Sequence, residues 1–300
     1  MLSDMHVIVW YHTSYTELFT LPPSISLVTM SLFLDLSELS PTRTLQSWLT
    51  MALMIIFRYY AIVYPLHVLL WVNKKIKGAR RLTLKEPTLA VIQHEQRLSN
   101  ISAFIYALPA SIVFDLWRWH GKTKMYATVP SCASDWLYLV ASGLFYLIVQ
   151  DAHFYWTHRL MHTSKWCYKY MHAGHHKSIQ PTPWASFSFD ALEAISAAWV
   201  LPALILIVPI HVYLAAILLI FMTVVAILNH AGWEVYPAEW LRPGHFFGDW
   251  IITASHHNKH HTHYLCNYGL YWRFWDKVCG TDGGLQACVT SSDETSAKED

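Results

Sequence analysis

Three histidine clusters, HRLMH (residues 158–162), HAGHH (172–176) and HNKHH (257–261), lie within the stretch from His153 to His263. This stretch holds 14 of the chain's 19 histidines. On a helix, residues three or four positions apart point from one face, so each cluster can direct its imidazoles toward one point. Neutral imidazole suits iron, zinc and copper. One zinc site needs only three or four ligands, so this number of histidines favours two metal ions.

The composition around these clusters is that of a membrane protein. The chain has 300 residues, of which 54% are hydrophobic and only 14% are charged. Soluble domains carry about 25% charged residues, and several apolar runs here approach the roughly 20 residues that cross a bilayer. The net charge of +1 argues against a nucleic-acid partner. The five cysteines form no C-x-x-C pair, which predicts free thiols.

The apolar runs predict an all-α membrane protein with about four transmembrane helices and a histidine-rich helical cap. Spans are expected at residues 48–72, 101–119 and 136–150, followed by a tight hairpin of two spans over 192–228. Pro109 is expected to kink the second span, and Pro209 interrupts the hairpin. The third span should continue as a helix as far as His162, which places the first cluster just outside the membrane.

The loop at residues 73–100 sets the expected orientation, because its seven lysines and arginines predict a cytoplasmic location. Counting the spans returns all three histidine clusters to the same side as this loop, so they can share a site. Four regions are expected: an N-terminal segment (1–47) that could lie on the membrane surface, the first three spans (48–150), a catalytic region (151–282) and a disordered tail (283–300). No secretory signal peptide is expected.

Other histidine-rich functions fit less well. A zinc peptidase is disfavoured because His94-Glu95 is not part of an H-E-x-x-H motif. Bis-histidine haem needs one histidine on each face and leaves the His-His doublets unexplained. A non-catalytic membrane metal carrier would place its ligands at mid-membrane, whereas these clusters lie outside the predicted spans. The carrier remains the alternative from another class.

Iron is the metal that this chemistry favours. Iron binds O₂ and changes its oxidation state, and removing hydrogen from an unactivated C–H bond of a lipid requires such redox chemistry. Two irons, one O₂ and two external electrons are sufficient. The chain carries no flavin, haem or nicotinamide motif, so a separate electron donor is required.

The three clusters and their flanks resemble the fatty acid hydroxylase/sterol desaturase superfamily of membrane di-iron enzymes. YWTHRLMH (155–162), YKYMHAGHHKSIQPTPWASF (168–187) and HNKHHTHYLCNYGLYWRFWDKVCGT (257–281) look like its three histidine boxes. The P-T-P segment and the VPIH turn (208–211) look most like the sterol C5-desaturase branch. Two departures are Asp190, where that branch usually carries a histidine, and NHAGWE (229–234), which is closer to the sterol C4-methyl oxidases.

The resemblance covers about residues 100–282 and implies a non-haem di-iron oxygenase that desaturates or hydroxylates a sterol-like lipid with O₂ and two electrons. A sterol C4-methyl oxidase or a fatty acyl hydroxylase of the same superfamily is the alternative. The implied electron donor is cytochrome b5 or a ferredoxin with its reductase. The implied location is the endoplasmic reticulum membrane or a bacterial inner membrane, with the histidine clusters on the cytoplasmic side.

Carried over by position, the resemblance implies a set of iron ligands. These are His158, His162, His172, His175, His176, His257, His260 and His261, with His230 as a ninth and His256 as the best of the remaining histidines. If residues 229–235 are helical, Glu234 lies one turn beyond His230 and could complete the set. Asp190 and Glu193 could orient ligand imidazoles through their N–H groups. Glu234 and Asp190 are the candidate catalytic carboxylates.

Overall fold

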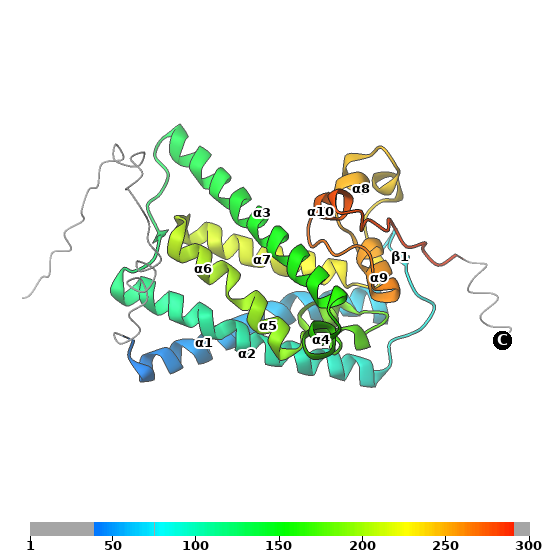
Figure 1. Ribbon diagram of the computed structural model, residues 1–300, viewed down its shortest axis with the longest axis horizontal. Coiled ribbons are helices and arrows are strands. Elements are labelled where there is room, and N and C mark those ends of the chain that lie inside the picture. Colours follow the sequence, from blue (N-terminus) through cyan, green and yellow to red (C-terminus); the bar gives the residue numbers. More distant parts are fainter. Residues whose placement is uncertain (1–38, 75, 291–300) are drawn as a thin grey trace, which may run out of the picture. The chain divides into compact units, whose positions relative to one another are not determined.

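The computed structural model describes residues 39–74 and 76–290. Most of the predicted N-terminal segment (1–47) and the last ten residues of the predicted tail lie outside this part of the chain. Among the described residues, four helices are long and apolar enough to cross a membrane, as predicted. They are α1 (Pro41–His67, extended by the π-helical turn η4, Val68–Val72), α2 (Leu89–His120), α3 (Ala133–Thr163) and α7 (Val212–Asn229) (Figure 1).

These helices run beyond the predicted spans because the apolar runs marked only their membrane-length portions. α1 begins at Pro41, α2 begins at Leu89 and continues through Pro109, and α3 carries the first histidine cluster to Thr163, as predicted. Many of their apolar side chains face outward, for example Phe57, which is 76% exposed. An apolar surface of this kind is expected to be covered by lipid.

The predicted hairpin turns at the expected place, but its first arm is short. α5 (Ala191–Ala198) and α6 (Val200–Ile207) are separated at Trp199, and together they are shorter than the four long helices. Pro202 lacks the N–H that would bond to the carbonyl of Ala198, which explains why one continuous helix does not form there. The hairpin therefore contributes one helix of spanning length, α7, where two were predicted.

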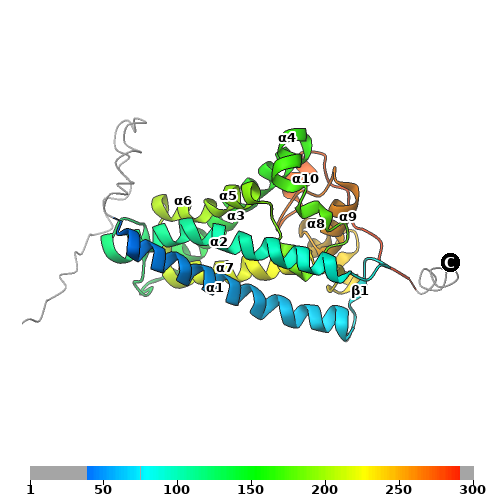
Figure 2. The same cartoon turned by 90° about the horizontal axis from the view of Figure 1, so that it is seen from below.

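Two short strand pairs tie the ends of these helices together. β1 (Arg80–Arg81) pairs antiparallel with β4 (Trp233–Glu234), and β2 (Met125–Tyr126) pairs parallel with β3 (Ile210–His211). The first pair joins the α1–α2 loop to the segment that follows α7. The basic loop therefore lies at the end of the helices that also carries the histidine clusters, on the right in Figure 1 and again in Figure 2.

The remaining elements are short and cluster at this same end. They are α4 (Lys165–Cys167), η5 (Tyr168–His172), η6 (His175–Lys177), η7 (Pro183–Phe187), η8 (Ala238–Leu241), α8 (Phe246–Trp250), α9 (Ala254–His263) and α10 (Phe274–Val278). Buried contacts fix η7 against the long helices, since Tyr59 and Ser99 both donate to the carbonyl of Trp184. All five cysteines lie in the described residues and are free, as predicted.

Candidate metal centre

Nine of the ten predicted metal-ligating histidines come together in two groups. The five-histidine group consists of His158, His162, His172, His176 and His260, and the four-histidine group of His175, His230, His257 and His261. Within each group, one ring nitrogen of each residue lies within 4.8 Å of the others. A metal–nitrogen distance of about 2.1 Å places opposite ligands about 4.2 Å apart, so both groups have the dimensions of a metal site.

Two of the three His-His doublets, 175–176 and 260–261, divide between the groups. His176 and His260 belong to the five-histidine group, whereas their neighbours His175 and His261 belong to the four-histidine group. Consecutive residues on a helical turn point in different directions, so each of these two doublets supplies one ring to each group. The rings of His176 and His261 lie 4.7 Å apart, which makes the two groups direct neighbours.

Helical spacing supplies two further pairs of rings. His158 and His162 lie four residues apart on α3 and both join the five-histidine group. His257 and His261 have the same spacing on α9 and both join the four-histidine group. His230 enters from a third direction, immediately after the last residue of α7.

Hydrogen bonds fix the tautomers of two rings in the five-histidine group. Nδ1 of His158 donates to the carbonyl of Tyr268 at 3.0 Å, and Nδ1 of His172 donates to Oε2 of Glu193 at 2.8 Å. Because carbonyls and carboxylates accept, each neutral ring presents an unprotonated Nε2. These two Nε2 atoms face each other at 3.1 Å. Two lone pairs repel at that distance unless a cation lies between them. The two Nε2 atoms are therefore suited to bind a metal ion.

The four-histidine group repeats this arrangement. Nδ1 of His230 donates to the carbonyl of Ala226 at 2.8 Å, and Nδ1 of His175 donates to the carbonyl of Ser188 at 3.1 Å. Their Nε2 atoms then face each other at 3.4 Å as lone pairs. Burial lowers the pKa of His230 to about 4 and holds the pKa of His175 well below its usual value, so both rings are neutral.

Backbone contacts hold the second cluster in place. Oδ2 of Asp190 accepts from the N–H of Gly174 at 2.6 Å, and Nε2 of His94 donates to the carbonyl of Gly174 at 3.0 Å. A Cβ at position 174 would collide with the Asp190 carboxylate, so this close approach requires glycine. Asp190 therefore holds the backbone between His172 and His175. The role of His94 was missed, because a lone histidine in a helix carries no local signal of such a contact.

Glu234 lies outside both histidine groups. The conditional prediction of a helix over residues 229–235 is wrong, since Glu234 belongs to strand β4 and Gly232 has a φ of +68°. The carboxylate accepts from the N–H groups of Ser255 and Tyr236, both at 3.1 Å. Burial raises its pKa. Glu234 thus anchors the start of α9, which carries the third cluster.

His256 is the predicted ligand that lies outside the two groups. Its Nδ1 accepts from the N–H of Thr253 at 3.2 Å and caps the start of α9. Because that nitrogen accepts a hydrogen bond, the proton of the neutral ring is on Nε2. Burial lowers the pKa of His256 to about 3, which favours the neutral ring. His257, one position further along the helix, points toward the four-histidine group instead.

The part of the chain that carries both histidine groups matches a known protein family. Residues 143–281 match the family model for fatty acid hydroxylase, and all nine grouped histidines lie within that range. The chain carries a fatty acid hydroxylase domain. The superfamily expected from the histidine boxes is thereby confirmed.

The chain is also similar to curated proteins named as sterol desaturases and lathosterol oxidase. The chain is 29% identical to a Delta(7)-sterol 5(6)-desaturase of Gibberella zeae over 186 residues, which cover 61% of this chain and 54% of the relative. It is 29% identical to the lathosterol oxidase of Homo sapiens over 203 residues, which cover 64% of each protein. The chain thus spans between about half and two thirds of the length of these relatives. No solved structure matches it.

Proposed function

We propose that the protein is a membrane-bound non-haem di-iron oxygenase that uses O₂ and two electrons to desaturate a sterol-like lipid. The observation that carries this proposal is the convergence of neutral Nε2 lone pairs in two adjacent histidine groups. The substrate class is supported by the relatives, which are named Delta(7)-sterol 5(6)-desaturase and lathosterol oxidase.

In this proposal the nine grouped histidines hold two irons, which when bound supply the redox chemistry that activates O₂. The chain's own residues orient the ligands. Glu193 and the carbonyls of Tyr268, Ser188 and Ala226 each accept a ring N–H and thereby aim the opposite nitrogen inward. The reaction converts a CH₂–CH₂ unit to CH=CH, consumes O₂ with two electrons and two protons, and releases two water molecules.

An external partner must supply the electrons in this reaction. We propose cytochrome b5 or a ferredoxin with its reductase, docking on the side of the membrane that carries the basic loop and the histidine groups. That side is proposed to be the cytoplasmic side, of the endoplasmic reticulum membrane in a eukaryote or of the inner membrane in a bacterium.

A lipid hydroxylase is the second candidate, favoured by the description of the matching family as fatty acid hydroxylase. Both reactions consume O₂ and two electrons. They differ in whether a second hydrogen is removed or an oxygen atom is inserted, and the histidine groups are compatible with both.

Metal and lipid analysis test the proposal. The purified protein is expected to contain two irons per chain and, with a reducing system, to consume O₂ in the presence of a Δ7-sterol. A product that lacks two hydrogens identifies a desaturase, and a product with one added oxygen identifies a hydroxylase. Protein that binds a single zinc and turns over no lipid would instead support a metal carrier.

A further inference from the structure

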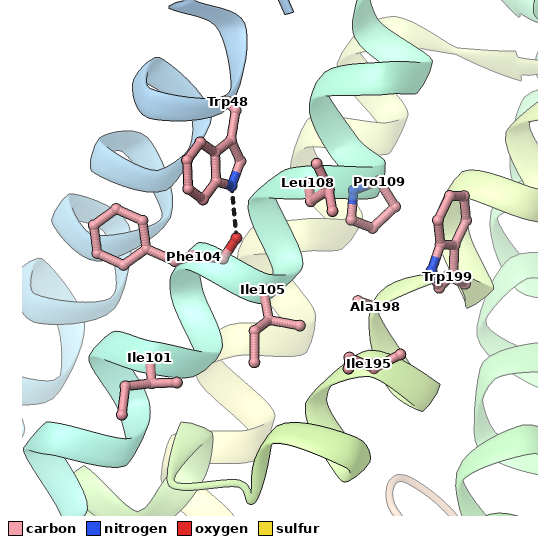
Figure 3. Close-up of a pocket in the computed structure, with 9 residues that line it drawn as sticks. All are labelled: Trp48, Ile101, Phe104, Ile105, Leu108, Pro109, Ile195, Ala198 and Trp199. Atoms are coloured by element: carbon pink, nitrogen blue, oxygen red, sulfur yellow. Dashed lines mark hydrogen bonds between the residues drawn. The ribbon is translucent and has the colours of Figure 1, made fainter. Parts of the chain in front are cut away.

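An apolar groove lies between α1, α2 and the break that separates α5 from α6 (Figure 3). Its volume is about 470 Å³, within the range of about 300–1,000 Å³ typical of small-molecule sites. Its walls include Trp48 of α1, Phe104 and Leu108 of α2, and Ile195, Ala198 and Trp199 of the α5–α6 segment.

Helix irregularities and one hydrogen bond shape this groove. Trp199 stands at the break between α5 and α6, and across from it Pro109 removes one backbone hydrogen bond from α2. Ala198 is small and buried. The indole N–H of Trp48 donates to the carbonyl of Phe104 at 2.8 Å, drawn as the dashed line in Figure 3. The donor of Trp48 is therefore already used, and that wall is held in place.

The occupant must be a lipid, because the groove opens along helices long and apolar enough to span a membrane. No charged side chain lines it. The walls combine flat aromatic rings with branched aliphatic side chains that have few accessible rotamers. A rigid, fused-ring hydrocarbon complements such walls with little loss of conformational entropy, whereas a flexible acyl chain loses rotamer freedom on binding.

The elements that line the groove also support both histidine groups through their buried faces. Ile195 lies two residues after Glu193, which bonds His172 of the five-histidine group. On the facing helix, Ser102 follows the groove residue Ile101 and donates to the carbonyl of Phe189. The ring of Phe189 lies 5.4 Å from that of His175 in the four-histidine group.

We propose that this groove binds the hydrocarbon skeleton of a sterol-like lipid on the outward-facing side of the helices that support the histidine groups. The identity of that lipid as the substrate rests on the proposed function. Binding itself requires no metal and no turnover.

Photolabelling with a diazirine-bearing sterol tests this inference on the full chain in phosphatidylcholine nanodiscs. Mass spectrometry is expected to place the label within residues 101–109 and 195–199, and excess unlabelled sterol should remove it. Ile195→Trp and Leu108→Trp should each reduce labelling on the order of tenfold by filling the groove. These two side chains are 46% and 48% exposed, so the larger ring has room without disturbing the core.

Ile217→Trp on α7 is the matched control, because Ile217 is also exposed and lies outside the groove lining. It should leave labelling unchanged. Label at other helices, label insensitive to the groove variants, or equal competition by phospholipid would overturn the inference. Normal iron content and sterol turnover without groove labelling would contradict lipid binding in the groove but not the proposed function. Groove labelling without sterol turnover would support lipid binding in the groove and contradict the proposed function.

Discussion

The five-histidine group and the four-histidine group use one kind of ligand in different surroundings. All four rings of the smaller group are buried, whereas His162 of the larger group is only partly buried. Tyr168 and Tyr264 cover that side, with ring centroids 5.7 Å from His162 and 4.8 Å from His176. The larger group is therefore closer to the protein surface, and the smaller is enclosed.

The two groups also differ in the acceptors that orient their rings. Glu193 bonds a ring of the five-histidine group, while among the described residues no carboxylate bonds a ring of the four-histidine group. A carboxylate partner raises the basicity of the ligand and offsets part of the ion's charge. Identical ligands thus need not produce equivalent sites, because the outer contacts decide charge and access.

Breaking one group at a time has the largest expected effect. His260→Ala leaves four rings in the five-histidine group, whereas His261→Ala leaves three in the four-histidine group. Both variants should lose metal and abolish turnover while keeping their helical content, and His261→Ala should lose more metal. Elemental analysis and circular dichroism measure these outcomes. Retained activity in His260→Ala would contradict its assignment as a ligand.

Removing this difference in acceptors should have the next largest effect. Glu193→Gln keeps the size of the side chain but replaces the carboxyl group beside His172 with an amide. We expect about 10- to 100-fold weaker binding of one ion, measured by competition with a chelator, and unchanged binding of the other. Glu239→Gln changes an exposed carboxylate and serves as the control. Equal weakening of both ions would show that the groups act as one unit.

The loop that supports the larger group allows a more moderate perturbation. Asp276 is buried and accepts hydrogen bonds from Tyr268 N, Gly269 N and Thr281 Oγ1. Asp276→Asn replaces one acceptor with a donor, so we expect the free energy of unfolding to fall by about 1–3 kcal/mol. Denaturant melts measure this change. Since Tyr268 orients His158, metal loss confined to the five-histidine group is expected, and loss confined to the other group would refute this account.

Removing the tyrosine ring that covers the five-histidine group should have the smallest effect. Tyr264 has a φ of +61°, so Tyr264→Gly removes the ring without adding backbone strain. We expect a chelator to extract the ion of the five-histidine group about two- to fivefold faster, with the second ion released at an unchanged rate. Stopped-flow absorbance separates the release of the two ions into a faster and a slower phase. An unchanged rate of the faster phase would mean that the Tyr264 ring does not limit access of the chelator to the five-histidine group.

Features that depend on residues close together in the sequence were predictable. The length of the apolar runs determined four spanning helices, Pro209 marked the turn before α7, and spacing of four residues paired His158 with His162. Local patterns failed where packing overrides them. The helix considered for residues 229–235 does not form, and Glu234 lies in a strand, because Gly232 packs against Trp71 and Pro181 and the chain turns there.

The sequence alone determined the membrane helices, the family and the supply of imidazoles, because these follow from composition and short-range spacing. Only the tertiary structure decided how the doublets 175–176 and 260–261 divide between the two groups and which acceptors orient rings such as those of His158 and His172. His176 meets His260 across 84 residues, and His158 meets the carbonyl of Tyr268 across 110. Such contacts depend on how distant helices pack, and no local pattern in the chain records that.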